Sequence, residues 1–257
     1  MSPPTHDTRD TVSRFSDRAA DHVKYRPTYP PDAIDWLLEG LGPPGALVVV
    51  DVGAGTGISS RLIADRGARV VAVEPGEGMR AAGAPHPRVT WLAARAERLA
   101  LQAETVDLVV CAQSFHWFDP VAVLPEFARV LRPQGRLAIM WNRRSEIDPY
   151  TQGYRQAIVD VGGEIRAERM PFYPAVMPAS GAFPEAERRA FANAQRLDLE
   201  GLLGRARSAS YVPKTGAEGA RLVKLLEALH ASHADADGIA TLVYETEIYR
   251  ARKLSLS

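Results

Sequence analysis

A glycine-rich turn that follows a short apolar run is the feature that most limits how this chain can fold. The run covers 46–50, is rich in valine, and continues as Asp51-Val52-Gly53-Ala54-Gly55-Thr56-Gly57. Such a run predicts a strand buried on both faces, and the glycines let the backbone turn sharply and approach a ligand closely. A helix over 59–66 and a second strand over 69–74 complete a predicted βαβ unit.

The same alternation of helices and strands continues to residue 141. Further strands are predicted at 88–93, 106–112 and 137–141, and a helix is predicted over 121–131. A first helix over 31–41 precedes the whole series. Alternation of this kind predicts a parallel α/β sheet.

The pattern weakens beyond Asn142, where prolines interrupt the helical spacing, until 242–249 predicts a late strand. The chain is long enough for one generous domain, and we see no internal repeat. We therefore predict a single domain, 1–257, in four parts: an arm at 1–30, a ligand-binding core at 31–142, a cap over the substrate pocket at 143–215, and a final helix and strand at 216–257.

Composition limits the partners and the location of the chain. The 31 basic and 31 acidic residues cancel, so no net charge attracts the chain to nucleic acid or to an anionic membrane. Cys111 is the only cysteine, which excludes an internal disulfide and favours a reducing, cytoplasmic setting. The first residues are polar where a secretory signal is apolar, and no segment approaches the roughly 20 apolar residues of a membrane span. We expect neither a nucleic-acid nor a membrane partner, and the oligomeric state stays open.

Two carboxylates flank the glycine turn and indicate what it binds. Asp51 precedes the glycines and Glu74 ends the second predicted strand, so both lie at the carboxyl edge of the sheet, where parallel sheets bind ligands. A dinucleotide fingerprint needs glycine or alanine where Ile58 stands, and Asp51 would repel a pyrophosphate at the helix start. A P-loop would need Gly-Lys-Ser/Thr at the end of the turn, and this turn lacks that pattern. A ligand with hydroxyls, a cation and no phosphate is favoured, and a nicotinamide dinucleotide is the alternative.

Several motifs resemble those of class I S-adenosylmethionine-dependent methyltransferases. They are VVDVGAGTG, the strand end VEP and Ala94-Arg95-Ala96-Glu97, within 46–141. The likeness to the methyltransferase-11 and trans-aconitate-methyltransferase-like group of small-molecule methyltransferases rests on Phe15-Ser16-Asp17-Arg18-Ala19, YRPTYP, AQSFHWFD and WNRR. The resemblance implies a Rossmann-like, doubly wound α/β fold. Its mostly parallel sheet of seven strands would have the order 3-2-1-4-5-7-6, with the last strand antiparallel.

The resemblance also implies which residues bind the cofactor, S-adenosylmethionine. The full set is Tyr25, Arg26, Asp51, Gly53, Ala54, Gly55, Thr56, Gly57, Glu74, Pro75, Met79, Ala96, Glu97 and Gln113. Within this set, the backbone at 53–55 would pass the methionine part, and Asp51 would support its amino group through the loop. Glu74 would hold the ribose hydroxyls.

The remaining members of the set surround the adenine and close the site. By the resemblance, Pro75 and Met79 flank the adenine, and Ala96 with Glu97 faces its edge. Tyr25 and Arg26 would close over the cofactor, and the arginine fork suits a carboxylate because it can bind with two hydrogen bonds.

Residues after the fourth and fifth predicted strands are candidates for the acceptor site. His116 is the candidate catalytic base for a hydroxyl or amine acceptor, and a packed wall residue is the alternative. Candidate substrate contacts are the aromatic residues Phe115, Trp117 and Phe118, for which a core position is the alternative. If the acceptor is a carboxylate, Arg143 or Arg144 is the candidate to orient it, with solvation as the alternative.

Other reactive residues do not suggest a further site. Cys111 lies in an apolar strand without the preceding proline of nucleophilic cytosine methyltransferases, which predicts a buried structural thiol. The Asp/Asn-Pro-Pro-aromatic signature of base amino methylation is also missing after the fourth predicted strand. His86, His230 and His233 lack a ligand spacing, so no metal is predicted, and the last two are expected on a solvated helix face.

The predicted reaction is direct in-line methyl transfer to a small-molecule carboxylate, hydroxyl or amine, with S-adenosylhomocysteine as the product. The sulfonium carries its own leaving group, so the protein mainly desolvates and aligns the acceptor. The alternatives are an NAD-dependent oxidoreductase and a non-catalytic S-adenosylmethionine-binding module.

Overall fold

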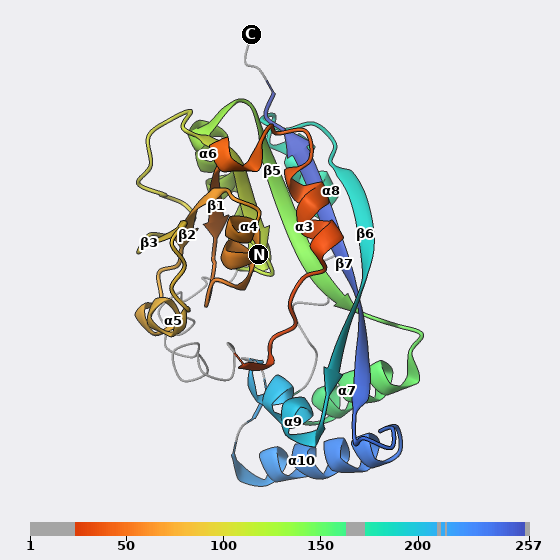
Figure 1. Ribbon diagram of the computed structural model, residues 1–257. Helices are drawn as coiled ribbons and strands as arrows, with labels where there is room; N and C mark the ends of the chain where they lie inside the picture. The colour runs from red at the N-terminus through yellow and green to blue at the C-terminus, as the bar shows by residue number, and fades with distance from the viewer. Residues whose placement is uncertain (1–23, 163–172, 210–211, 214, 255–257) are drawn as a thin grey trace, which may run out of the picture.

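A sheet in the order β3-β2-β1-β4-β5-β7-β6 runs through the molecule (Figure 1). The computed structural model describes residues 24–162, 173–209, 212–213 and 215–254. The strands are β1 (Val48–Val52), β2 (Arg69–Val73), β3 (Val89–Leu92), β4 (Val106–Ala112), β5 (Leu131–Arg144), β6 (Glu187–Leu197) and β7 (Ala240–Arg252). Pairing is parallel from β3 across to β5, whereas β7 is antiparallel to β5 and to β6. The predicted fold class and strand order are confirmed.

The first four strands lie within two residues of their predicted positions, but the later strands differ. β5 was predicted only over 137–141 and extends to Arg144, because residues 136–144 pair with β7. β6 lies within 143–215 and was not predicted as a strand. Its more buried face carries Phe191, Asn193, Gln195 and Leu197, and the two polar residues in the middle break the hydrophobic alternation that would predict a strand. The strand forms because β7 pairs with it along its whole length.

Helices surround the sheet and extend below it (Figure 1). They are α3 (Pro31–Leu38), α4 (Ile58–Asp65), α5 (Glu77–Ala82), α6 (Pro120–Val130), α7 (Pro149–Gly162), α8 (Tyr173–Ala179), α9 (Leu199–Arg207) and α10 (Gly216–Ala231), with 3-10 turns η1 (Pro44–Ala46) and η2 (Phe115–Trp117). Within the described ranges, none of these helices has the length and apolar character needed to cross a membrane.

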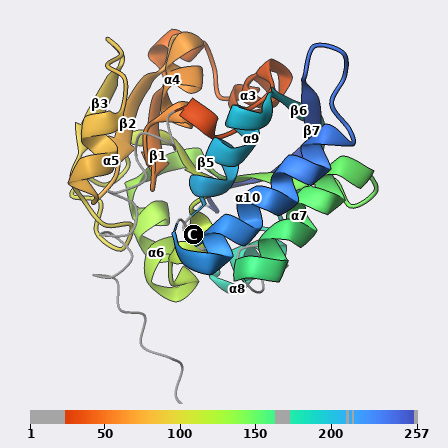
Figure 2. The same cartoon turned by 90° about the horizontal axis from the view of Figure 1, so that it is seen from below.

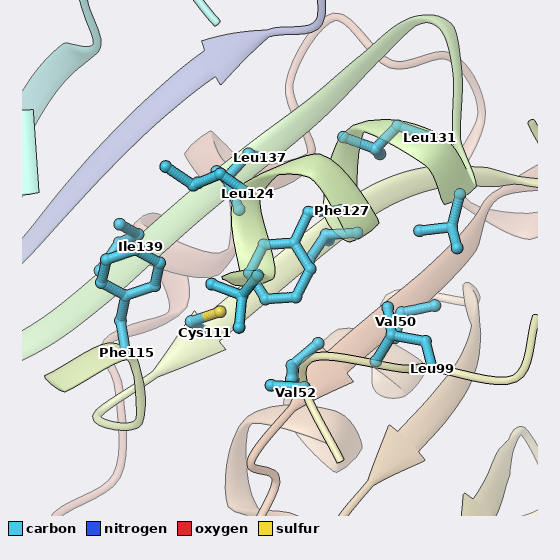
Figure 3. Close-up of a cluster of buried hydrophobic side chains, with 14 of the residues drawn as sticks. Val50, Val52, Leu99, Cys111, Phe115, Leu124, Phe127, Leu131, Leu137 and Ile139 are labelled. Atoms are coloured by element: carbon cyan, nitrogen blue, oxygen red, sulfur yellow. The ribbon is translucent and has the colours of Figure 1, made fainter. Parts of the chain in front are cut away.

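Two hydrophobic clusters lie on opposite faces of the sheet. Helices α3 and α4 cover one face, whereas α6 and α8 cover the other, where Phe127 and Leu124 pack on β4 and β5 (Figure 3). The first crossover, through α4, and the later one, through α6, therefore lie on opposite faces, as in a doubly wound sheet. The reversal of strand order falls between β1 and β4, so the ligand-binding crevice is expected at their carboxyl ends.

A third cluster joins α7, α9 and α10 to the far ends of β6 and β7 (Figure 2). His230 of α10 belongs to this layer and is 6% exposed, so its predicted place on a solvated face is wrong. Its Nδ1 lies 3.1 Å from the Tyr150 hydroxyl and its Nε2 lies 3.0 Å from the Gly238 carbonyl oxygen. The helical spacing did not reveal this position, because two polar partners replace water around the ring. His233 is exposed as predicted.

Arginines of β5 and β7 hold the end of α3 against the sheet. The Arg250 guanidinium carbon lies 3.6 Å from the centre of the Trp36 ring, and its Nη1 donates to the Trp36 carbonyl. Its Nε also donates to Glu187 at 3.0 Å. Arg136 donates to the carbonyl of Glu39 at 2.9 Å. The Trp36 carbonyl also accepts from the Glu39 amide at 3.3 Å, so the arginines add donors to the carbonyls at the end of the helix.

We expect Arg250→Met to lower the free energy of unfolding by about 2 kcal/mol, since a buried carbonyl loses a charged donor. Methionine keeps an apolar stem near Trp36 but removes the hydrogen bonds, the charge over the Trp36 ring and the ion pair with Glu187. The control is Arg252→Met on the same strand, where an exposed arginine donates to Gly40 and the expected loss is within about 0.5 kcal/mol. Urea denaturation measures both, and equal losses would contradict this account.

Candidate active site

The glycine turn joins β1 to α4 and is fixed by its own backbone amides. Its φ angles lie in the left-handed region, at +70° for Gly53, +57° for Gly55 and +74° for Gly57. The amides of Gly53 and Ala54 donate to the carbonyl of Val73, at 2.8 and 3.0 Å. A Cβ at position 53 would lie 2.6 Å from Cβ of Ser114, so only glycine fits there. Gly53 and Gly55 keep partial exposure, whereas Ala54, Thr56 and Gly57 are buried.

Asp51 lies beneath the turn and is fully buried. Its Oδ2 accepts hydrogen bonds from the hydroxyls of Ser59 and Ser60, both at 2.6 Å. Both serines stand in the first turn of α4, so the carboxylate occupies the positive end of the helix, where a ligand anion would otherwise bind. Burial raises the pKa of Asp51, and the hydrogen bonds from Ser59 and Ser60 oppose that rise.

Glu74 bridges the loops that follow β1 and β2. Its Oε2 accepts from the amide of Gly55 at 3.0 Å, and its Oε1 accepts from the amide of Gly76 at 2.8 Å. Burial raises the pKa of Glu74, and these two hydrogen bonds oppose the rise. Each carboxylate oxygen keeps a further lone pair, so the group can accept from a pair of ligand hydroxyls as well.

The predicted adenine-side residues gather near the ends of β2 and β3. Met79 and Ala96 are buried, whereas Pro75 and Glu97 are exposed. Beside them is a surface pocket of about 380 Å³, lined by Pro75, Ala93, Ala94, Arg95 and Arg98. Its lining combines small apolar side chains with two arginines. Sequence reasoning did not identify Arg98, which gave no motif.

Gln113 connects the end of β4 to β5. Its backbone has a φ of +58°, and its amide donates to the carbonyl of Met140 at 2.9 Å. Its side-chain Nε2 donates to the carbonyl of Asn142 at 3.3 Å. The strand end therefore turns sharply at Gln113 and directs the following residues back over the glycine turn.

Three residues after β4 pack against β1 and the glycine turn. Ser114 Oγ donates to the Val52 carbonyl at 2.5 Å. The ring of Phe118 approaches Gly53, since its Cζ lies 3.1 Å from where a Cβ would stand. Phe115 is fully buried in the hydrophobic cluster of Figure 3, so its side chain lies in the core and not at the predicted acceptor surface. Ser114 was missed because a serine in a loop carries no distinctive signal.

His116 lies between two indole rings. Its ring centre is 4.4 Å from that of Trp117 and 4.9 Å from that of Trp141, to which it stands edge-on. Nδ1 is buried, and no described residue provides a hydrogen bond to it. Burial, with the positive charge of Arg26, lowers the pKa of His116 to about 3. The imidazole is therefore neutral near pH 7 and a weak base in this state.

The last two residues of β5, Arg143 and Arg144, point to opposite faces of the sheet, because side chains alternate along a strand. Arg143 donates to Glu247 at 3.3 Å and to Glu146 at 3.2 Å, on the Trp141 side. Arg144 lies on the other face, with its guanidinium carbon 5.4 Å from the centre of the Tyr154 ring. The pair therefore cannot act together on one acceptor group.

Trp117 is 48% exposed and can contact a ligand.

The arm residues Tyr25 and Arg26 lie far from the glycine turn in sequence but reach the same region. Tyr25 packs its ring on Gly204 of α9, where an added Cβ would lie 2.3 Å away, and its hydroxyl donates to Glu200 at 2.8 Å. Arg26 Nη2 donates to the Ser208 carbonyl at 3.0 Å, and its charge acts on His116. The structure thus brings Arg26 to the end of β4, whereas Tyr25 faces α9. The arm motif at 15–19 lies outside the described residues.

Comparison with known proteins places this arrangement in a family. The model of a methyltransferase domain, that of the methyltransferase-11 family, matches residues 50–139. An uncharacterised methyltransferase of Schizosaccharomyces pombe is 31% identical over 196 residues, which cover 73% of this chain and 75% of the relative. The chain belongs to the methyltransferase-11 family.

Other relatives of this chain match over different lengths. An uncharacterised methyltransferase of Mycobacterium tuberculosis is 44% identical over 139 residues, or 54% of this chain, and the match spans 56% of that relative. The solved structure of a putative type II methyltransferase from Anaeromyxobacter dehalogenans is 26% identical, with a TM-score of 0.65, and the match covers 89% of this chain and 97% of that one. The predicted family is thus confirmed by sequence and by fold.

The single cysteine of the chain is a core residue. Cys111 of β4 is fully buried, and burial raises the pKa of its thiol well above the ordinary value, with the nearby Asp51 carboxylate adding to the rise. The thiol stays protonated at neutral pH and is shielded from ligands. This agrees with the prediction of a structural thiol.

We expect acid to destabilise the folded chain through His116. The unfolded histidine takes up a proton near pH 6.5, whereas the folded one does so only near pH 3, so stability falls as the pH drops between these values. The slope from this residue is up to about 1.4 kcal/mol per pH unit. Urea denaturation between pH 6.5 and pH 4.5 should show it in the native chain and not in His116→Gln.

The difference between native chain and variant isolates this effect, because Asp51 and Glu74 act in the opposite direction. Their folded pKa values are raised, so they favour the folded state as the pH falls. The control is His233→Gln, which removes an exposed histidine and should leave the slope unchanged. Equal slopes in the native chain and His116→Gln would show that His116 titrates normally.

Proposed function

We propose that this chain transfers a methyl group from S-adenosylmethionine to a small-molecule acceptor. The observation that carries the proposal is that the protein's own groups already satisfy the glycine turn. The amides of Gly53, Ala54 and Gly55 donate to Val73 and Glu74, and Asp51 occupies the start of α4. No anion is needed to satisfy these donors, so a pyrophosphate has no place here. A cofactor without phosphate suits the site.

The residues present fit S-adenosylmethionine. Gly53 and Gly55 are partly exposed and have no side chain, so a ligand can lie directly against the backbone. Glu74 keeps free lone pairs on both oxygens for a ribose diol. Arg26 offers a guanidinium for the methionyl carboxylate from the other side of the crevice. We propose that Pro75, Met79, Ala96 and Glu97, which gather near the ends of β2 and β3, surround the adenine.

S-adenosylmethionine supplies an activated methyl group with its own leaving group, and the protein then has to align an acceptor and exclude water. Phe118 lies on Gly53 at the end of β4, and Trp117 and Trp141 flank His116. These aromatic side chains can exclude water from the reacting atoms. The segment 143–215 and the arm are proposed to cover the acceptor.

The state of His116 bears on the class of acceptor. A histidine with a pKa near 3 holds a proton poorly, so it is badly suited to deprotonate an alcohol or an ammonium group. A neutral ring nitrogen can still accept a hydrogen bond and orient an acceptor. We therefore favour an acceptor that arrives already deprotonated, such as a carboxylate, with Arg143 or Arg144 as the candidate to orient it. A hydroxyl or amine remains the second candidate.

We expect the purified chain to bind S-adenosylmethionine in calorimetry and to show no binding of NAD at the same concentration. Glu74→Gln should weaken binding by about tenfold, because an amide keeps the shape but loses the charge and one acceptor for the ribose. Glu77→Gln, an exposed carboxylate at the start of α5, is the control. Binding of NAD alone would favour the oxidoreductase.

Transfer of a labelled methyl group to a panel of metabolites then separates an enzyme from a binding module. Labelled products would support transfer. Tight S-adenosylmethionine binding with no product from carboxylates, alcohols or amines would favour the binding module.

We expect His116→Ala to lower kcat by less than about tenfold if the acceptor is already ionised, because no proton then has to be removed. Loss by about 100-fold or more, with a pH profile that flattens in the variant, would instead assign general-base catalysis to His116. The measurement is the steady-state rate between pH 6 and pH 9 with the acceptor found above. Trp117→Ala, which leaves the imidazole in place, controls for lost packing.

A further inference from the structure

Thr28 of the arm is held on the sheet through its backbone carbonyl. This oxygen accepts from Nδ2 of Asn142 at 3.1 Å and from Nδ2 of Asn193 at 2.9 Å. Pro27 and Pro30 flank it and have no N–H to offer to a neighbouring strand, so side chains take over the task of strand pairing. The side chain of Thr28 is exposed, whereas Pro27 and Tyr29 are buried. The arm is therefore anchored at this residue.

A buried hydroxyl sets the orientation of the Asn142 amide. Thr246 is fully buried and lies opposite Asn142 in the pairing of β5 with β7. Its Oγ1 donates to Asn142 Oδ1 at 2.5 Å, and Asn193 Nδ2 lies 3.1 Å from the same oxygen. With Oδ1 engaged in this way, the Nδ2 donor of Asn142 faces the arm. We call Asn142, Asn193 and Thr246 the Thr28 latch.

The latch lies between the arm and the end of β4. The backbone carbonyl of Asn142 accepts from Gln113, the residue at which β4 turns toward His116. Arg26 lies two residues before Thr28 in the arm. It donates to the Ser208 carbonyl, and its charge helps to lower the pKa of His116. Burial raises the pKa of Tyr29, the Asp51 carboxylate adds to the rise, and the charge of Arg26 opposes it. The arginine therefore lies close enough to His116 and Tyr29 for its charge to affect the pKa of both.

Gln195 adds a second attachment on the same strand as Asn193. Its Nε2 donates to the carbonyl of Tyr25 at 2.9 Å. Arg26 thus lies between two backbone carbonyls, of Tyr25 and Thr28, that side chains of the sheet hold in place. A short segment fixed on both sides leaves the arginine little freedom, so less entropy is lost when it binds an anion.

We propose that Asn142 is a positioning residue that, with Asn193 and Thr246, holds the Thr28 carbonyl and thereby sets Arg26 over the cofactor. The inference rests on the proposed function for one point, that Arg26 binds the methionyl carboxylate of S-adenosylmethionine. Asn142 acts through Arg26 and does not touch the reacting atoms. Its effect is on cofactor affinity and KM, with kcat at saturation changed less.

The test uses Asn142→Asp in the full chain. One carboxylate oxygen still accepts from Thr246, whereas the other replaces the donor and faces the Thr28 carbonyl, so the arm is repelled. We expect the Kd for S-adenosylmethionine to rise about tenfold. The double variant with Arg26→Ala should bind no more weakly than Arg26→Ala alone, because the latch acts through that arginine. Additive losses would overturn the proposal.

A second readout needs no cofactor. Because the Arg26 charge helps to hold down the pKa of His116, release of the arm should raise that pKa in Asn142→Asp, as followed by NMR titration of the imidazole. An unchanged pKa would overturn the proposal. If the native chain binds no S-adenosylmethionine, the proposed function fails, and the latch is decided by this titration alone.

Two further variants separate positioning from general stability. Asn193→Asp tests the same carbonyl from the edge strand β6, where a half-buried site tolerates change if Asn142→Asp does not fold, and the same two results are expected. Tyr150→Phe removes a buried hydroxyl bonded to His230 in the helical layer, away from the arm. It should lower stability and leave Kd and the His116 pKa unchanged. Equal changes in Tyr150→Phe would show that the latch effect is only structural.

Discussion

A buried carboxylate under the first βα connection is the interaction on which the rest of this structure depends. Asp51 is fully buried, and such a group is tolerated only when hydrogen bonds replace its water. Ser59 and Ser60 provide those bonds to its Oδ2 from the first turn of α4, whereas no described residue bonds to Oδ1, and the start of the helix is thereby tied to the end of β1. The glycine turn above is then free to bond with β2. Its shape therefore exists before any ligand binds, which lowers the cost of binding.

The long strands β5 and β7 extend this arrangement to the acceptor side. They continue beyond the ends of β1 and β4 and carry β6 with them, which gives α7, α9 and α10 a surface to pack on. The arm runs between α3 and this helical layer (Figure 1), and it is held by side chains of β5 and β6. One sheet thus positions the glycine turn, the loop that carries His116, and Arg26.

The sequence predicted best where a pattern is local. The strands from β1 to β4 and the turn between β1 and α4 were predicted because valine-rich runs and closely spaced glycines are read within a few residues. β6 was missed, since the polar Asn193 and Gln195 lie on its more buried face between Phe191 and Leu197, and only the pairing with β7 makes this segment a strand. Phe115 was assigned to the acceptor surface although its ring is in the core. Which way a residue after a strand points depends on how the loop folds back, and spacing does not encode that.

By itself, the sequence determined the glycine turn and the two carboxylates beside it and favoured a ligand without phosphate, because these depend on residue types at short separations. Only the tertiary structure decided that Asp51 caps α4, that Arg143 and Arg144 face opposite sides, and that His116 is neutral between two indoles. The pKa of a histidine and the partners of a carbonyl are properties of a surrounding that distant segments build. Asn142 shows this most clearly, because its meaning lies in a hydrogen bond to an oxygen 114 residues away in the chain.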